Sequence, residues 1–432
     1  MSEAEAAAST EAVHRTINAI WRIESAKLIA GLARLVRDVG LAEDLAQDAF
    51  VAALEQWPES GIPANPGGWL MAAAKHRAID QIRRRENFDR KQSQIAGEIE
   101  HARGAGADIH EALDDDVGDD LLRLIFTACH PVLSTDARVA LTLRLLGGLT
   151  TGEIARAHLA SEATIAQRIV RAKRTLTEAR VEFELPRGEQ RDARLASVLE
   201  VIYLIFNEGY SATEGDRLIR QELCDEALRL GRILTGIAPG EPEVHGLVAL
   251  MEIQASRLRA RVGPTGEAIL LLDQDRGRWD RLLINRGLAA LDRAASLGPL
   301  GPYALQAAIT ACHARAATAA DTDWERIVAL YDALAQLTPS PVVELNRAVA
   351  IAMAFGPAAG LEIVEELSGE RALERYHLLH SVRGDLLEKL GRHEEARTAF
   401  EAAASLTRNE RERDLLALRA RANVSPSLRM TS

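Results

Sequence analysis

Apolar residues recur at helical spacing along this chain of 432 residues, from the segment that begins at Leu41 to the C-terminal region. Hydrophobic residues make up 47% of the chain and aromatic residues only 4%. Ala and Leu are abundant, whereas runs of β-branched residues, which favour strands, are few. This pattern favours helices that pack on helices. We predict an all-α protein of about three units, at about 100 to 200 residues per domain.

Charge is distributed unevenly along the chain. Acidic residues outnumber basic ones by 63 to 52, a formal net charge of −11, so any nucleic-acid binding must be local. Basic residues gather at Lys75–Lys91 and at Arg168–Arg180, and the stretch Glu98–Asp120 between them carries nine acids against Arg103 alone. That acidic stretch is typical of a flexible linker. We expect four parts: residues 1–95, an acidic linker at 96–118, residues 119–187, and a helical extension at 188–432.

Metal, cofactor and membrane motifs are not apparent in the sequence. Cys129, Cys224 and Cys312 are far apart and form no CxxC pair, so they indicate neither a disulfide framework nor a zinc site. The chain shows no P-loop, no GxGxxG after a strand and no HExxH, and we expect it not to be an enzyme. Its longest apolar stretch, Ala196–Phe206, is far shorter than the roughly 20 residues of a membrane helix. We expect a cytoplasmic protein without cofactors, metals or a membrane partner.

The segment Leu41–Trp57 has two apolar sides when drawn as a helix. Leu45 marks one side and Trp57 the other, with a strip of carboxylates on the edge between them. Such a helix is either buried in its own fold, with a solvated acidic edge, or shared with a partner protein. The strip consists of Asp44, Asp48 and Glu55.

The segment Trp69–Arg85 places a tryptophan on its basic side, away from its apolar stripe. An aromatic ring beside Arg77 and Arg84 suits unstacked bases and phosphates. The stretch Pro58–Gly68 before it is rich in Pro and Gly, and we predict a loop that could hold a flipped base. The alternative is that Trp69 packs against a neighbouring helix and the arginines are merely solvated.

A helix-turn-helix pattern follows the acidic stretch. Leu149–Ala157 reads as a short helix, His158–Ala160 as a turn, and Ser161 as the cap of a second helix. In that second helix Gln and Arg side chains lie opposite the apolar face, where they could read adenine and guanine edges, with Lys173 and Arg180 placed for phosphates. The alternative is an ordinary amphipathic helix with exposed arginines. The outward residues are Thr164, Gln167, Arg171 and Arg174.

The C-terminal extension carries a repeat-like pattern. Its last unit has Gly384, Gly391, Ala396, Phe400 and Ala403 at offsets 0, 7, 12, 16 and 19. These offsets resemble a tetratricopeptide repeat, in which small residues lie where two antiparallel helices touch and an aromatic ring lies between them. Such repeats offer a concave surface, so we expect a protein or peptide partner here.

A second feature of the extension is the stretch Phe206–Tyr210. We interpret it as the end of a helix, terminated at Gly209, in a packed interface. This interpretation is favoured over a catalytic role for Glu208.

Two segments and their order resemble a known family. Trp21–Arg85, with "AEDLAQDAFVAALEQW" and "NPGGWLMAAAKHRAIDQIRRR", resembles region 2 of bacterial RNA polymerase sigma factors of the extracytoplasmic-function type, within the sigma-70 superfamily. Leu121–Leu176 resembles their region 4. "VLEVIYLIFNEGYSATEG" and the repeat-like tail resemble the subgroup with a C-terminal tetratricopeptide-like extension. The resemblance implies a sigma factor that binds core RNA polymerase and directs promoter recognition, DNA melting and initiation, with the extension regulating it in cis.

The resemblance also implies roles for individual residues. The core-polymerase-binding residues are Asp44, Gln47, Asp48 and Phe50. The residues that melt and read the minus 10 element are Asn65, Trp69, Lys75, Arg77, Asp80, Arg83 and Arg84. The residues that read the minus 35 duplex are Thr164, Gln167, Arg168, Arg171, Lys173 and Arg174. The acidic linker matches the segment that threads the polymerase cleft.

Two residues depart from the expected pattern, and one other function stays open. Leu159 stands in the turn where such motifs often have Gly, and Asp80 either reads a cytosine amino group or pairs with Arg77 or Arg84. The alternative function is a helix-turn-helix transcription regulator with a helical-repeat sensor, which leaves the face around Trp69 unexplained.

Overall fold

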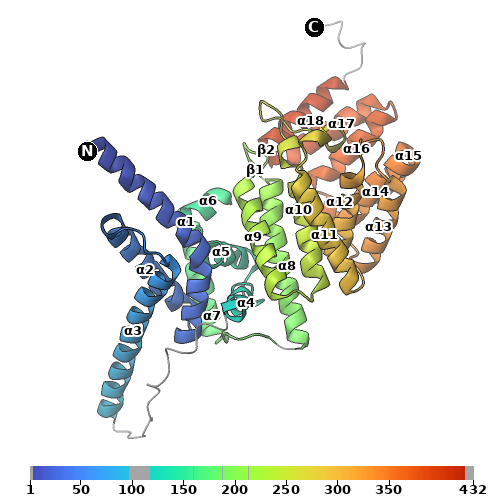
Figure 1. The fold of residues 1–432 in the computed structure, drawn as a ribbon. Coiled ribbons are helices and arrows are strands. Elements are labelled where there is room, and N and C mark those ends of the chain that lie inside the picture. The colour runs from blue at the N-terminus through green and yellow to red at the C-terminus, as the bar shows by residue number, and fades with distance from the viewer. Residues whose placement is uncertain (1–2, 97–116, 159, 187, 213, 424–432) are drawn as a thin grey trace. The chain divides into compact units, whose positions relative to one another are not determined.

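The computed structural model describes residues 3–96, 117–158, 160–186, 188–212 and 214–423. Within this part of the chain there are 18 α-helices, four short 3-10 helices and two strands of two residues each, which confirms the all-α prediction. The chain forms two compact units, Met1–Val201 and Ile202–Ser432 (Figure 1). None of the described helices is long and apolar enough to cross a membrane. The predicted linker, residues 96–118, lies almost wholly outside the described residues.

The first unit is built on a long helix at the N-terminus. Helix α1 packs against α2, α3 and α4, and its buried side chains, Ile29 and Leu32 among them, form the centre of the unit. Side-chain caps begin the later helices: Asp38 accepts the N–H of Leu41 at the start of α2, and Ser134 caps α5. The helices are α1 (Glu3–Val36), α2 (Val39–Ser60), α3 (Pro66–Ala96), α4 (Val117–Ala128), α5 (Thr135–Leu145), α6 (Thr151–Ala157), α7 (Glu162–Glu178) and α8 (Glu189–Tyr210).

The loop between α2 and α3 is shorter than the loop that we predicted from its Pro and Gly residues. The predicted loop Pro58–Gly68 is wrong at both ends, because α2 continues through Pro58 to Ser60 and α3 begins at Pro66. Proline is well suited to the first position of a helix, where its missing N–H has no helical acceptor and its φ is already helical. Gly61, at φ 81°, ends α2 and donates its N–H to the carbonyl of Trp57 at 3.0 Å.

The second unit is a succession of packed helices. Each helix from α12 to α18 contacts the next one along the chain, and α10 contacts α9, α11 and α12. Strands β1 and β2 pair in parallel, and the buried Asn409 side chain donates to the carbonyl of Ala212 at 2.8 Å, which joins the last helices to the start of the unit. The elements are β1 (Glu214–Gly215), α9 (Gln221–Ile237), α10 (Pro242–Ala255), η1 (Leu258–Ala260), η2 (Leu271–Asp273), η3 (Arg276–Arg278), α11 (Arg281–Leu297), α12 (Pro302–Arg315), α13 (Trp324–Leu337), α14 (Pro341–Phe355), α15 (Pro357–Leu367), η4 (Arg371–Leu373), α16 (His377–Lys389), α17 (His393–Leu406), β2 (Arg408–Asn409) and α18 (Glu410–Ala422).

The last helix pair packs as its repeat-like pattern predicts. A Cβ placed on Gly384 of α16 would lie 2.7 Å from the ring of Phe400 on α17, and Phe400 is fully buried. Gly391, at φ 74°, lies in the turn between the two helices. The small residue and the aromatic ring therefore set the close approach of α16 and α17.

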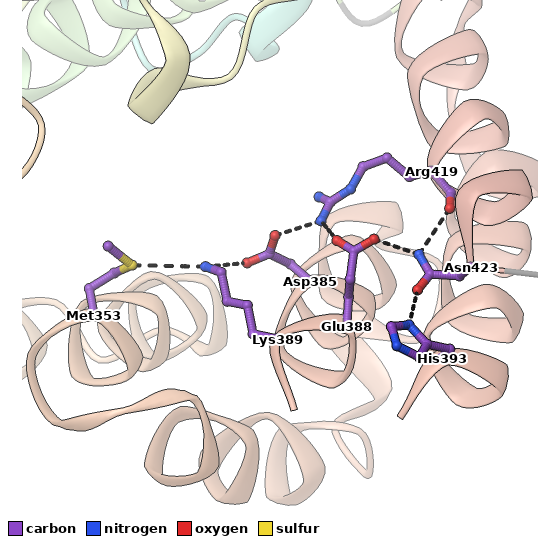
Figure 2. A network of polar contacts seen from close by, with 7 residues as sticks. All are labelled: Met353, Asp385, Glu388, Lys389, His393, Arg419 and Asn423. Carbon is purple, nitrogen blue, oxygen red and sulfur yellow. Dashed lines mark hydrogen bonds and ion pairs between the residues drawn. The ribbon is translucent and has the colours of Figure 1, made fainter. Parts of the chain in front are cut away.

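A polar network holds α18 against that pair (Figure 2). Arg419 of α18 pairs with Asp385 at 2.8 Å and with Glu388, both on α16, and its guanidinium lies 4.4 Å from the centre of the Phe400 ring. Burial alone would raise the pKa of Asp385, but hydrogen bonds from Lys389 and Arg419 outweigh it and hold that pKa below its usual value. The other members of the network are Met353, His393 and Asn423.

The stretch Phe206–Tyr210 confirms the packed-interface interpretation and corrects one detail. Helix α8 continues through Gly209 to Tyr210, so the predicted stop at Gly209 is wrong. A Cβ on Gly209 would lie 2.7 Å from the backbone nitrogen of Cys224, and this residue is glycine because α9 begins so close to it. Glu208 forms an ion pair with the buried Arg220, which gives it a structural partner.

We expect Gly384→Ala to lower the melting temperature of the protein. The added methyl group overlaps the Phe400 ring, and overpacking of this kind costs about 1 to 3 kcal/mol, or about 2 to 10 °C for a unit of this size. Gly236→Ala is the matched control, since a Cβ there meets nothing within 4 Å and the change should be neutral or slightly stabilising. Calorimetry of both variants checks this, and equal melting temperatures would refute the close-approach argument.

Candidate nucleic-acid interface

Helix α7 presents a polar face opposite its packing face. Ser161 caps the helix by accepting the N–H of Thr164 at 3.1 Å, as the sequence predicts. Ile165 and Ile169 are buried against the neighbouring helices, whereas Gln167 is exposed. Arg171, Arg174 and Thr164 are exposed with it. The predicted division of this helix into a packing face and an outward polar face is confirmed.

Two arginines near this face are held by carboxylates. Arg174 pairs with Glu178 at 2.6 Å, and Arg168 pairs with Asp136 of α5 at 3.2 Å. Both pairs lie at the surface, where solvent and salt screen the attraction, so they contribute little to stability. The charges are available to a stronger anion such as phosphate.

The first helix of the motif, α6, begins with a capping box. Thr150 accepts the N–H of Glu153 at 3.1 Å, and the Glu153 carboxylate accepts the N–H of Thr150 at 2.8 Å. The turn that follows includes Leu159, which lies outside the described residues.

The basic side of α3 has a tryptophan that packs against another aromatic ring. Trp69 meets the fully buried Trp57 of α2 edge to face, with ring centres 5.3 Å apart, and remains half-buried. The packing alternative for Trp69 is therefore partly realised. Arg77, Asp80 and Arg83 are exposed along the same helix, Lys75 is half-buried, and the Arg84 side chain lies outside the described residues.

Asn65 caps α3. Its Oδ1 accepts the N–H of Gly68 at 2.9 Å, and its backbone carbonyl accepts the N–H of Trp69 at 3.1 Å. A Cβ on Gly68 would lie 2.7 Å from the Asn65 side chain, so glycine leaves room for the cap. The Asn65 side chain therefore stabilises the start of α3, a role that the family resemblance did not imply.

Helix α2 is covered on much of its second apolar side by its own unit. The ring of Phe50 packs against Trp21 of α1 in a tilted arrangement, with ring centres 4.6 Å apart, and Trp57 is fully buried. Val51, beside Phe50, is 50% exposed and Asp48 is also exposed, so part of the helix is still open to a partner.

A buried carboxylate that the sequence reasoning missed lies on the same helix. Glu43 is only 2% exposed. It accepts a hydrogen bond from Arg144 Nε of α5 at 2.6 Å and forms an ion pair with Lys173 of α7. Lys173 Nζ also lies 3.5 Å from Asp44, and Gln47 donates to Glu43. Lys173 thus faces α2 rather than joining the exposed residues of α7.

The described residues hold no group of three or more His, Cys, Asp or Glu side chains placed to bind a metal ion. All three cysteines are buried, and burial raises the pKa of Cys129 and of Cys224 to about 12. Such thiols stay protonated near neutral pH and are poor ligands or nucleophiles.

Comparisons with known proteins assign the two helical regions. The family Sigma-70 region 2 matches residues 23–88, and Sigma-70, region 4 matches residues 123–176. An uncharacterized protein of Rhizobium meliloti is 44% identical over 396 residues, which is 89% of this chain and 90% of that protein. The sigma factor SigC of Mycobacterium tuberculosis, a member of the extracytoplasmic-function group, is 32% identical over 145 residues, which is 32% of this chain and 70% of SigC. The chain belongs to the sigma-70 family, in its extracytoplasmic-function group. It has the function of a sigma factor in transcription initiation.

Relatives named as sigma factors match less than half of this chain. The probable sigma factor SigI of Mycobacterium tuberculosis is 28% identical over 178 residues, which is 41% of this chain and 60% of SigI. A family of unknown function, DUF6596, matches residues 194–295 of the extension. The sigma-factor residues implied by the sequence all lie inside the two matched regions.

The cap geometry distinguishes two roles for Asn65. We expect Asn65→Asp to keep the melting temperature, because aspartate also caps helices, whereas Asn65→Ala should cost about 1 kcal/mol. If Asn65 only caps, promoter-specific transcription by the Asp variant should equal that of the wild type. A loss of transcription at unchanged melting temperature would show instead that the amide contacts DNA.

Proposed function

We propose that this sigma factor docks on core RNA polymerase through α2 and reads promoter DNA with α3 and α7. The single observation that carries the proposal is the exposed polar face of α7, opposite its buried packing face and inside the region 4 match. The exposed charges of α3 lie inside the region 2 match and provide the second reading surface. We place the protein in the cytoplasm, where polymerase and promoter DNA are found.

The docking and reading residues are those that the family resemblance implies. Asp44, Gln47, Asp48 and Phe50 contact the polymerase. Asn65, Trp69, Lys75, Arg77, Asp80, Arg83 and Arg84 melt and hold the minus 10 strand. Thr164, Gln167, Arg168, Arg171, Lys173 and Arg174 contact the minus 35 duplex. Trp69 is only half-buried, and bases stack on exposed aromatic rings with little sequence preference.

The second unit regulates transcription in cis by binding a protein or peptide. It contains a cavity of about 710 Å³ between α9, α10 and α11. Arg232 and Arg286 reach it from α9 and α11, and the buried Glu252 holds both, at 2.8 Å and 3.3 Å. The mixture of charges with Leu228 and Leu283 suits a peptide better than a small apolar ligand.

Run-off transcription with core polymerase tests the reading face. We expect Arg171→Ala to relax the preference at one base pair of the minus 35 element, at a cost of roughly 1 to 3 kcal/mol. Arg180→Ala is the matched control, because an arginine placed for phosphate should weaken all promoters alike. A uniform loss with Arg171→Ala would mean that this side chain touches only phosphate. Tight duplex binding without polymerase would favour an ordinary helix-turn-helix regulator.

Truncation tests regulation by the second unit. Residues 1–201 contain both sigma matches and form a compact unit, so we expect this fragment to keep promoter specificity. Its output should differ from that of the full chain, both in vitro and in cells. Equal output in both settings would contradict regulation in cis.

A further inference from the structure

Three arginines of the second unit lie around two aromatic rings. The Arg261 guanidinium lies 3.7 Å from the centre of the Tyr210 ring, and the Arg257 guanidinium lies 5.9 Å from the same centre. Arg257 is also 5.7 Å from the centre of the Trp279 ring, and Arg276 lies 4.9 Å from that centre. Arg257 and Arg276 are each only 8% exposed. We call Arg257, Arg261 and Arg276 the arginine cluster, because they bring three positive charges together in a largely buried place.

Carboxylates do not neutralise the arginine cluster. Among the described residues, no Asp or Glu forms an ion pair with any of its three guanidinium groups. Glu412 and Asp321 attract members of the cluster only from a distance. Glu412 accepts a hydrogen bond from Thr407 Oγ1 at 2.9 Å, and Asp321 accepts one from Thr318 Oγ1 at 2.8 Å. The part of the chain that the structure describes therefore offers the cluster no matching negative charge.

The pKa values of groups in and beside the cluster reflect this excess of positive charge. Burial lowers the pKa of Arg261 and of Arg276, and the charge of Arg257 lowers both further. Burial and the charges of Arg257 and Arg276 also lower the pKa of His313 to about 4. The His313 ring is therefore neutral near neutral pH and adds no charge of its own.

Arg257 differs from the other two arginines in its hydrogen bonds. Arg261 donates to the carbonyl oxygen of Tyr210, and Arg276 donates to that of Ala316 at 2.8 Å. Arg257 donates to no residue in the described part of the chain, and its Nε is buried. A buried guanidinium without an acceptor is costly, because it has lost its hydration and gained no hydrogen bond in return.

Other polar atoms of the same neighbourhood also lack partners. Arg276 Nε, Trp279 Nε1 and His313 Nδ1 are buried and have no hydrogen-bond partner among the described residues. Buried polar groups in folded proteins are nearly always satisfied by protein, water or a ligand. Unsatisfied nitrogen atoms beside uncompensated positive charge favour a ligand that is negatively charged and rich in acceptor oxygens.

We propose that Arg257 is the anion-binding residue of a site for the phosphate or carboxylate group of a small molecule, with Arg261 and Arg276 supplying further positive charge. A guanidinium binds either group through charge-assisted hydrogen bonds, and its planar fork matches two oxygen atoms at once. A compact group suits the site better than a protein surface does, because Arg257 and Arg276 are more than nine-tenths buried. The 8% of Arg257 that stays exposed means that the residue is not sealed from solvent.

The proposed anion site is separate from the cavity of about 710 Å³ in the same unit. Ser256 and Leu258, the chain neighbours of Arg257, line that cavity, whereas Arg257 does not. Anion binding also requires neither polymerase nor promoter DNA, so it can be measured independently of the function proposed above.

Calorimetric titration of the full chain tests the site. The probes are phosphate, pyrophosphate and citrate, each balanced with sodium chloride to constant ionic strength. We expect saturable binding of one equivalent and a rise in melting temperature with the bound probe. Stronger binding of the phosphates or of citrate distinguishes a phosphorylated from a carboxylated ligand. Absence of saturable binding with all three probes would overturn the proposal.

Arg257→Met tests the residue, since it removes the charge and keeps much of the apolar stem. We expect binding to weaken by about tenfold or more, as for the loss of a hydrogen bond to a charged group. Without anion, its melting temperature should equal or exceed that of the wild type, because an unpaired buried charge has been removed. Arg259→Met is the matched control, an exposed arginine two residues further on, and should bind like the wild type.

A second variant, Arg257→Gln, keeps a polar side chain and should also bind about tenfold more weakly if Arg257→Met fails to fold. Undiminished binding by a folded Arg257 variant would overturn the proposal. Binding that is lost in Arg259→Met and kept in the Arg257 variants would place the anion in the 710 Å³ cavity, which Arg259 lines, and would overturn it as well.

Discussion

Close approach of helices through small residues is the constraint on which both units depend. A Cβ on Gly246 of α10 would lie 2.7 Å from the backbone nitrogen of Ala304, and one on Gly360 of α15 would lie 2.6 Å from the carbonyl oxygen of Ala348. In the first unit, Ala42 and Ala49 of α2 are completely buried. With so few aromatic side chains available, the core is filled by bringing backbones together, and dense packing supplies the stabilising contacts.

The positions of the charged residues matter more for DNA binding than the net charge of the protein does. The net charge of −11 includes an acidic segment and a long extension, while basic side chains line α3 and α7. A weak overall field gives little general attraction to DNA, so productive promoter binding should depend on the polymerase.

Sequence periodicity predicted much of the candidate site. The polar face of α7, its Ser161 cap and the exposed carboxylates of α2 all follow from the order of residues along one helix. Two helix ends were predicted wrongly from single residues. Helix α2 continues through Pro58, and Gly209 lies inside α8. In both cases neighbouring structure outweighed the usual preference of the residue, since Gly209 is required by the approach of Cys224 rather than by a helix end.

The sequence by itself determined that the chain is helical, where its helix faces lie and which two segments resemble sigma regions. These are properties of short windows, in which spacing, caps and motifs can be read directly. Only the tertiary structure decided that Glu43 is buried and that Lys173 faces α2. Arg144 lies 101 residues from Glu43, and Lys173 lies 129 residues from Asp44, so no local pattern connects them. The Glu43 carboxylate becomes buried only when α2, α5 and α7 pack together.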